Sequence, residues 1–139
     1  MILLFLVVWA VDSFLLKRTT FLASSIPLLV RVLLGVLLIG GGGYLGWSAH
    51  ELLFGEEGDP RRLLDSGVFG ISRHPLYLGV VVSLLGLSVS TVSLASMAVL
   101  TVFFLVYDRF ASYEERQLLT AFGEEYREYR RRVPKWILR

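Results

Sequence analysis

The run Leu76–Tyr107 spans 32 residues without a single charged side chain. As one helix it would extend about 48 Å at ~1.5 Å per residue. That length exceeds the hydrocarbon thickness of a bilayer, which is about 30 Å. Small hydroxyl residues gather near the middle of the run, at Ser88, Ser90, Thr91 and Ser93. We therefore predict a tight hairpin of two short membrane helices over residues 76–107, with its turn at 88–93.

The composition of the whole chain supports a membrane location. Of its 139 residues, 55% are hydrophobic, and the mean hydropathy is +0.64. A water-soluble protein of this size must cover its core with polar surface, but here the polar residues cluster at 50–74 and 108–139. The length fits one domain. We predict a single-domain (1–139), all-α integral membrane protein with about four transmembrane helices.

Residues 1–47 are expected to supply the first two membrane helices. A signal peptide is the competing interpretation of residues 1–16, but the basic segment that precedes the apolar stretch of a signal peptide is missing. Pro27 suits the first turn of the second helix, which we expect to end near Trp47. The glycine run at 40–46 lacks the Lys-Ser/Thr of a phosphate loop. Gly42 and Gly46, one turn apart, predict close packing against another helix.

The two polar segments, 48–75 and 108–139, hold eleven of the fourteen Lys and Arg residues. The positive-inside rule therefore places both segments, and both termini, in the cytoplasm. We expect 48–75 to form a loop and the tail to form an amphipathic helix, interrupted near Gly123 and ended by Pro134. Its apolar positions recur every three or four residues: Leu118, Leu119, Phe122, Tyr126, Tyr129 and Val133.

Composition and motifs exclude several kinds of site. The chain has no cysteine, so disulfides, thiolate metal sites and cysteine nucleophiles are absent. The segment beginning at His50 opens like a zinc-protease signature but lacks the second histidine, so we expect no metal. Glutamates alternate with the basic residues of the tail, which argues against nucleic-acid binding.

Ionisable residues stand at both ends of the predicted hairpin and on the same membrane face. A cluster of Arg73, His74, Tyr77, Asp108, Arg109, Glu114 and Glu115 could hold a zwitterionic small molecule. Arginine offers a planar fork to a carboxylate, and glutamate accepts from an ammonium group. Each residue alone also has a structural explanation: Arg73 a lipid headgroup contact, His74 an interfacial position, Tyr77 the aromatic belt. Only their joint placement indicates a site.

The order and spacing of these residues resemble the isoprenylcysteine carboxyl methyltransferase family, whose plan the phospholipid N-methyltransferases share. The resemblance covers about residues 64–136. It rests on two motifs: Gly67-x-Phe69-x-x-x-Arg73-His74-Pro75-x-Tyr77-x-Gly79, and Glu114-Glu115-x-x-Leu118-x-x-x-Phe122-Gly123-x-x-Tyr126-x-x-Tyr129.

The resemblance implies a membrane methyltransferase that uses S-adenosylmethionine without a soluble Rossmann domain. It implies a cofactor site lined on one side by residues at the start of the hairpin, with segment 108–139 folding over them. The implied cofactor-binding residues are Arg73, His74, Pro75, Tyr77, Gly79, Glu114 and Glu115, with His74 and Arg73 as the implied catalytic residues.

The methyl acceptor is expected to be lipid-like or amphipathic, either an isoprenylcysteine-type carboxylate or a phospholipid-type amine. A carboxylate needs no general base, whereas an amine must lose a proton, and His74 is the first candidate base. The alternative is a non-catalytic membrane protein that keeps the fold as a lipid-binding or assembly module.

Overall fold

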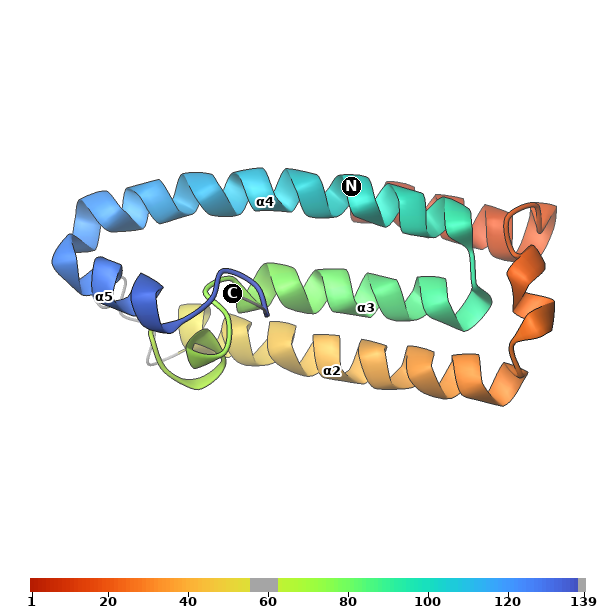
Figure 1. The fold of residues 1–139 in the computed structure, drawn as a ribbon, viewed down its shortest axis with the longest axis horizontal. Helices are drawn as coiled ribbons and strands as arrows, with labels where there is room; N and C mark the ends of the chain where they lie inside the picture. Colours follow the sequence, from red (N-terminus) through yellow and green to blue (C-terminus); the bar gives the residue numbers. More distant parts are fainter. Residues whose placement is uncertain (56–62, 138–139) are drawn as a thin grey trace. The chain divides into compact units, whose positions relative to one another are not determined.

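The computed structural model describes residues 1–55 and 63–137, and over these residues it is helical, without a strand (Figure 1). The elements are α1 (Ile2–Ala10), a π-helical turn (Val11–Leu16), a 3₁₀ turn (Phe21–Ser25), α2 (Leu28–Phe54), a second 3₁₀ turn (Gly67–Gly70), α3 (Pro75–Thr91), α4 (Leu94–Phe122) and α5 (Glu124–Arg132). The all-α prediction is confirmed.

The chain forms two compact units. The first unit comprises Met1–Gly42 and Val81–Val106, and the second comprises Gly43–Val80 and Tyr107–Arg139. Helices α2, α3 and α4 each contribute residues to both units. Every residue of the predicted site belongs to the second unit.

Two helices of the described chain are long and apolar enough to cross a membrane. These are α2, with a mean hydropathy of 2.0 over its most apolar 18 residues, and α4, with 1.6 over its own. The segment Ile2–Leu16 and helix α3 are apolar but shorter. Four crossings therefore stay a prediction.

In the first unit, α2 and α3 approach each other at Gly35 and Gly86. A Cβ atom on Gly86 would lie 2.7 Å from the Gly35 carbonyl oxygen, and one on Gly35 would lie 2.9 Å from that of Gly86. Close packing by glycine thus occurs here and not at Gly46, where an added Cβ would meet no described atom within 4 Å. The prediction for Gly46 was wrong because spacing alone does not reveal which helix face meets a neighbour.

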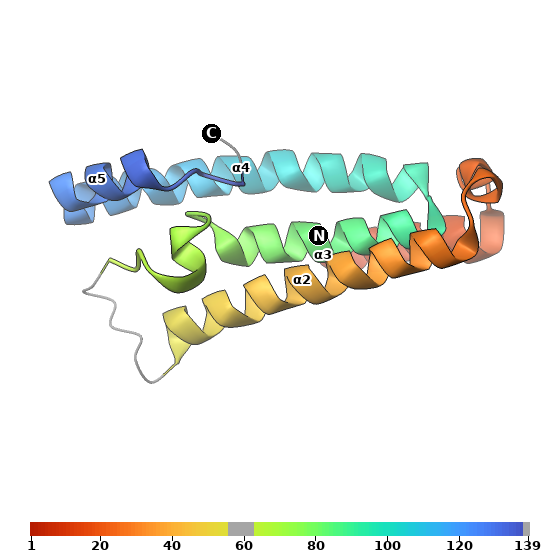
Figure 2. The ribbon, with the colours of Figure 1, turned by 60° about the horizontal axis from the view of Figure 1, so that its bottom comes forward.

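Helix α2 continues seven residues beyond the predicted end at Trp47, as the unbroken helix in Figure 2 shows. Between Trp47 and Gly55 the chain contains neither glycine nor proline. Ala49 is fully buried and packs with Val68 and Phe69. The prediction that 48–75 is a loop was therefore wrong for its first residues. Residues 56–62 lie outside the described part of the chain.

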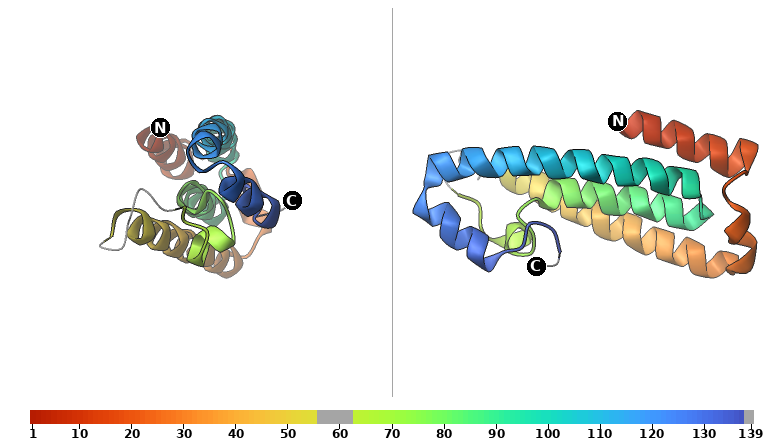
Figure 3. Two further views of the ribbon diagram at one scale, coloured as in Figure 1. Left: turned by 90° about the vertical axis from the view of Figure 1, so that its left-hand side faces the viewer. Right: turned by 45° about the horizontal axis from the view of Figure 1, so that its top comes forward.

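The tail keeps its predicted periodicity, but the predicted boundary at 107 was wrong, because residues 108–122 continue the helix α4 that begins at Leu94. Helix α4 ends at Phe122, and the chain turns at Gly123, whose φ of 55° favours glycine (Figure 3). Helix α5 ends before Pro134, as predicted. The predicted apolar positions form one cluster, with Tyr126, Tyr129 and Val133 buried against Leu63 and the others half-buried.

Candidate functional site

The site is built around the short segment that leads into α3. Helix α5 and the segment that follows it lie against this segment through three hydrogen bonds. The Arg73 amide donates to the Pro134 carbonyl at 3.1 Å, and the Ser72 hydroxyl donates to the Lys135 carbonyl at 3.0 Å. The Tyr129 hydroxyl donates to the Phe69 carbonyl at 2.8 Å. These bonds fix the backbone that carries Arg73 and His74.

Glu115 of α4 joins the two basic residues of the motif. Its Oε1 atom lies 3.1 Å from Nη2 of Arg73 and 3.3 Å from Nε2 of His74. The side chains of Arg73, His74 and Glu115 are 9%, 4% and 11% exposed. A buried charge needs partners of this kind, since an unpaired one is costly.

Glu114 completes the arrangement from the neighbouring position of α4. One of its oxygens lies 3.6 Å from Nδ1 of His74, and the other accepts a hydrogen bond from the Tyr77 hydroxyl. Burial opposes charge on the imidazole, but the carboxylates of Glu114 and Glu115 outweigh it and raise the pKa of His74. Both ring nitrogens thus face carboxylate oxygens, which suits the protonated ring.

A cavity of about 640 Å³ opens beside these groups. Its polar lining residues are Arg73, His74, Tyr77, Glu114 and Gln117. The remaining lining is mostly apolar and includes Pro75 together with Leu53, Phe54, Phe69, Leu76, Leu118, Ala121 and Phe122. The volume lies within the range of small-molecule sites, about 300–1,000 Å³.

Two of the seven implied cofactor-binding residues do not line this cavity. Gly79 is buried on α3, one turn after Pro75, and Glu115 lies against Arg73 and His74. The structure thus brings Arg73, His74, Tyr77, Glu114 and Glu115 into one cluster. It does not bring Arg109 into it, because that side chain is exposed.

Three buried polar atoms at the site have no hydrogen-bond partner among the described residues. They are Nε and Nη1 of Arg73 and the Tyr126 hydroxyl oxygen. Buried donors are normally satisfied, so donors left over beside a cavity indicate a ligand that accepts hydrogen bonds. Arginine donors beside the Glu114 carboxylate fit a zwitterion, such as the carboxylate and ammonium of S-adenosylmethionine. The residues present therefore fit the cofactor that the sequence resemblance implies.

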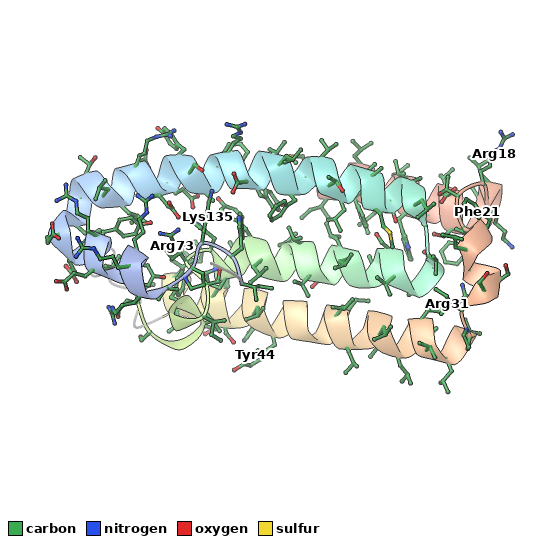
Figure 4. All side chains as sticks on the ribbon, viewed as in Figure 1. Arg18, Phe21, Arg31, Tyr44, Arg73 and Lys135 are labelled. Carbon is green, nitrogen blue, oxygen red and sulfur yellow. The ribbon has the colours of Figure 1, made fainter. Side chains whose placement is uncertain are left out.

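Sequence reasoning missed the residues that fasten the C-terminal segment. The Lys135 ammonium donates to the Asp108 carboxylate and, at 2.8 Å, to the Ser112 hydroxyl. The Trp136 indole donates to the same carboxylate at 3.1 Å, and its ring centre lies 5.8 Å from that of His74. Figure 4 labels Lys135 and Arg73. The only sequence sign of this contact was the pair Lys135-Trp136 directly after Pro134. In the sequence alone, this pair looks like part of a solvated basic tail.

Aromatic rings extend the site along α3 and α4. The rings of Tyr77 and Tyr107 stack with 5.0 Å between their centres, and His74 stacks on Tyr77 at 6.0 Å. Such faces suit a cationic ligand group. Among the described residues, no group of three His, Cys, Asp or Glu side chains could hold a metal ion.

Comparison with known proteins gives a family match. The model of the phospholipid methyltransferase family matches residues 30–125, which is more than half of the chain. Methanethiol S-methyltransferase 1 of Bradyrhizobium diazoefficiens is 35% identical over 61% of this chain and 29% of its own. Protein-S-isoprenylcysteine O-methyltransferase of Homo sapiens is 35% identical over 86% of this chain and 42% of its own.

A third relative has a name of a different kind. The cobalt-zinc-cadmium resistance protein CzcN of Cupriavidus metallidurans is 42% identical over 55% of this chain and 36% of its own. The matches to these relatives span less than half of each relative's length. No solved structure matches the chain significantly.

Proposed function

The chain belongs to the phospholipid methyltransferase family, and from this premise we propose that it is a membrane methyltransferase that uses S-adenosylmethionine. The observation that carries the proposal is the buried cluster of Arg73, His74 and Glu115, with two guanidinium nitrogens unpartnered beside a cavity. An ordinary structural ion pair would leave no such donors.

Each side chain of the cluster has a role toward the cofactor in this proposal. The free donors of Arg73 bind its carboxylate, and Glu114, which lines the cavity, binds its ammonium group. Glu115 holds Arg73 and His74 in place. The sulfonium supplies a methyl group that is already activated for displacement, so the protein mainly positions the acceptor and excludes water.

The acceptor in this proposal is lipid-like or amphipathic. The cavity is lined by polar side chains, among them His74 and Glu114, and by apolar ones, among them Phe54 and Phe122, as an amphipathic acceptor requires. A carboxylate acceptor needs no base. An amine acceptor gives up a proton, and the His74 imidazole takes it once the ring itself is deprotonated. The relatives named above act on a thiol and on an isoprenylcysteine, so the family name alone does not decide the acceptor.

Four membrane crossings, with both termini and the site on the cytoplasmic face, are also part of the proposal. The distribution of basic residues supports it. Reporter fusions after Gly58 and after Arg139 are expected to give the same signal, and one at Thr91 the opposite signal. Gly58 and Arg139 lie outside the described residues. Opposite signals from Gly58 and Arg139 would overturn the four-crossing topology.

A labelled-methyl transfer assay tests the activity. Purified protein is incubated with S-adenosylmethionine labelled in its methyl group and with total membrane lipid, and the label is followed into the lipid fraction. In parallel, S-adenosylhomocysteine is expected to raise the melting temperature of the detergent-solubilised protein. A melting shift without methyl transfer would indicate that the protein binds the cofactor but acts on an acceptor other than membrane lipid. The absence of both at millimolar ligand would favour the non-catalytic alternative.

A further inference from the structure

A second cavity, of about 490 Å³, lies within the first unit and has no part in the methyl-transfer chemistry. It is bounded by residues of the π-helical turn, the connection to α2, the start of α2 and the end of α3. Two of its lining residues are cationic, Lys17 and Arg31, and none is acidic. We propose that this cavity binds the phosphate group of an anionic membrane lipid.

The charge balance around the cavity favours an anion. The first unit contains three basic residues, Lys17, Arg18 and Arg31, and one acidic residue, Asp12. The Asp12 carboxylate accepts hydrogen bonds from the Thr19 amide and hydroxyl and from the Ser93 hydroxyl, and it does not line the cavity. Asp12 therefore has its own donors, and the cations at the cavity wall are left without an acidic partner there.

Arg31 is the clearest example of a cavity-lining cation without an acidic partner. Its Nε atom is buried and has no hydrogen-bond partner among the described residues. An orphaned guanidinium nitrogen at a cavity wall is a donor held ready for an acceptor, and guanidinium groups match phosphate oxygens. Figure 4 labels Arg31 near the start of α2.

Lys17 lies at the start of the connection that leads to α2, and its backbone conformation is fixed. Its φ of 51° is rare for a residue with a side chain, and its amide donates to the Asp12 carbonyl at 2.7 Å. The hydroxyl of Thr20 adds a neutral donor to the lining. Two cations, one on this connection and one on α2, thus line one cavity together with Thr20, as the binding of a phosphate group requires.

The surroundings of the cavity distinguish a lipid from free phosphate. Large apolar side chains beside it are exposed, among them Phe14 at 59%, Leu28 at 63% and Leu29 at 69%. Phe14 and Leu28 also line the cavity. A lipid would place its headgroup between Lys17 and Arg31 and its acyl chains against these side chains, whereas inorganic phosphate would leave them uncovered.

Titration calorimetry on the delipidated full chain in neutral detergent tests the proposal. The probes are short-chain phosphatidylglycerol, phosphatidylcholine with the same acyl chains, and inorganic phosphate. We expect saturable binding of phosphatidylglycerol alone. Arg31→Gln and Lys17→Gln should each weaken it by roughly tenfold or more, because each removes a charge-assisted contact. Arg18→Gln is the matched control, since Arg18 is exposed and does not line the cavity.

Each other outcome would overturn the proposal. Equal binding of phosphatidylcholine would show that the negative charge is not recognised. Equal binding of inorganic phosphate would show that the acyl chains do not contribute, so that the ligand need not be a lipid. An equal loss in Arg18→Gln would indicate diffuse surface attraction in place of a site. If Arg31→Gln does not fold, Lys17→Gln decides alone, because Lys17 is exposed and its substitution leaves the backbone contact to Asp12 in place.

Discussion

His74 Nε2 lies 3.3 Å from Glu115 Oε1, although 41 positions separate the two residues in the chain. The contact joins the segment before α3 to the charged half of α4. The same carboxylate oxygen also lies 3.1 Å from Arg73. One glutamate therefore orients both residues that the sequence motif places directly before α3.

Glu114→Gln is expected to weaken the binding of S-adenosylhomocysteine by about 1.5–3 kcal/mol, the usual value of a hydrogen bond to a charged group. Glutamine keeps the shape and the hydrogen bond from Tyr77 but loses the charge that would face the ligand ammonium. Calorimetry on the folded, solubilised variant measures the change. Glu124→Gln and Glu128→Gln are the controls, because both side chains are exposed on α5, and parental affinity in all three variants would contradict the site.

Glu115→Gln is expected to act differently, because Glu115 does not line the cavity but is buried against Arg73 and His74. Removing its charge leaves a buried arginine without its counter-ion, so the melting temperature should fall even without ligand. The comparison is between melting curves of the Glu114→Gln and Glu115→Gln proteins. A larger loss of stability in Glu114→Gln would reverse the assigned roles.

Stability is expected to depend on pH through His74. Its pKa is raised in the folded protein, so the protonated ring stabilises the fold. This contribution is fully present below the ordinary histidine pKa of about 6.5 and is lost as the pH rises through the higher folded-state value. Melting temperatures from pH 6 to pH 9 should fall across this window in the parent protein and less in His74→Gln. His50→Gln, at the exposed histidine, should keep the parental slope.

Two glycine substitutions should have opposite effects on stability. Gly86→Ala places a Cβ atom 2.7 Å from the Gly35 carbonyl oxygen, and overpacking of this kind costs about 1–3 kcal/mol. Gly46→Ala meets no described atom within 4 Å and replaces a poor helix former, which should stabilise α2 by up to about 1 kcal/mol. The melting temperatures of both variants test these two expectations. Destabilisation by Gly46→Ala would show that Gly46 makes an unrecognised contact.

The contact between Lys135 and Asp108 is expected to support cofactor affinity from outside the cavity. Lys135→Gln and Asp108→Asn should each loosen the C-terminal segment and weaken S-adenosylhomocysteine binding. Because both act on the same contact, the double variant should lose less than the sum, with a coupling energy of about 1 kcal/mol. Strict additivity would show that the two residues act independently.

The predictable parts of this molecule were those with a local signal. The apolar periodicity of the tail identified Tyr126 and Tyr129 as buried, and the turn chemistry identified Gly123. The extension of α2 to Phe54 was not predictable, because it depends on the packing of Ala49 against Val68 and Phe69, nineteen and twenty positions away. The candidate site was predicted from its charged motif, whereas Lys135 and Trp136 were missed because a basic tail offers no sign of which residue turns inward.

The ion pairs within the cluster of Arg73, His74, Glu114 and Glu115 affect the heat that calorimetry would measure on cofactor binding. With His74 protonated, the charges of the cluster balance one another, since the two carboxylates face Arg73 and both nitrogens of His74. A cation that binds the Glu114 carboxylate must therefore displace one of its present partners, His74 or Tyr77. Association is then an exchange reaction: its net heat is the difference between two ion pairs, and a proton released from the imidazole passes to the buffer. Heats measured in two buffers would then differ by the number of protons exchanged multiplied by the difference between the two ionisation enthalpies.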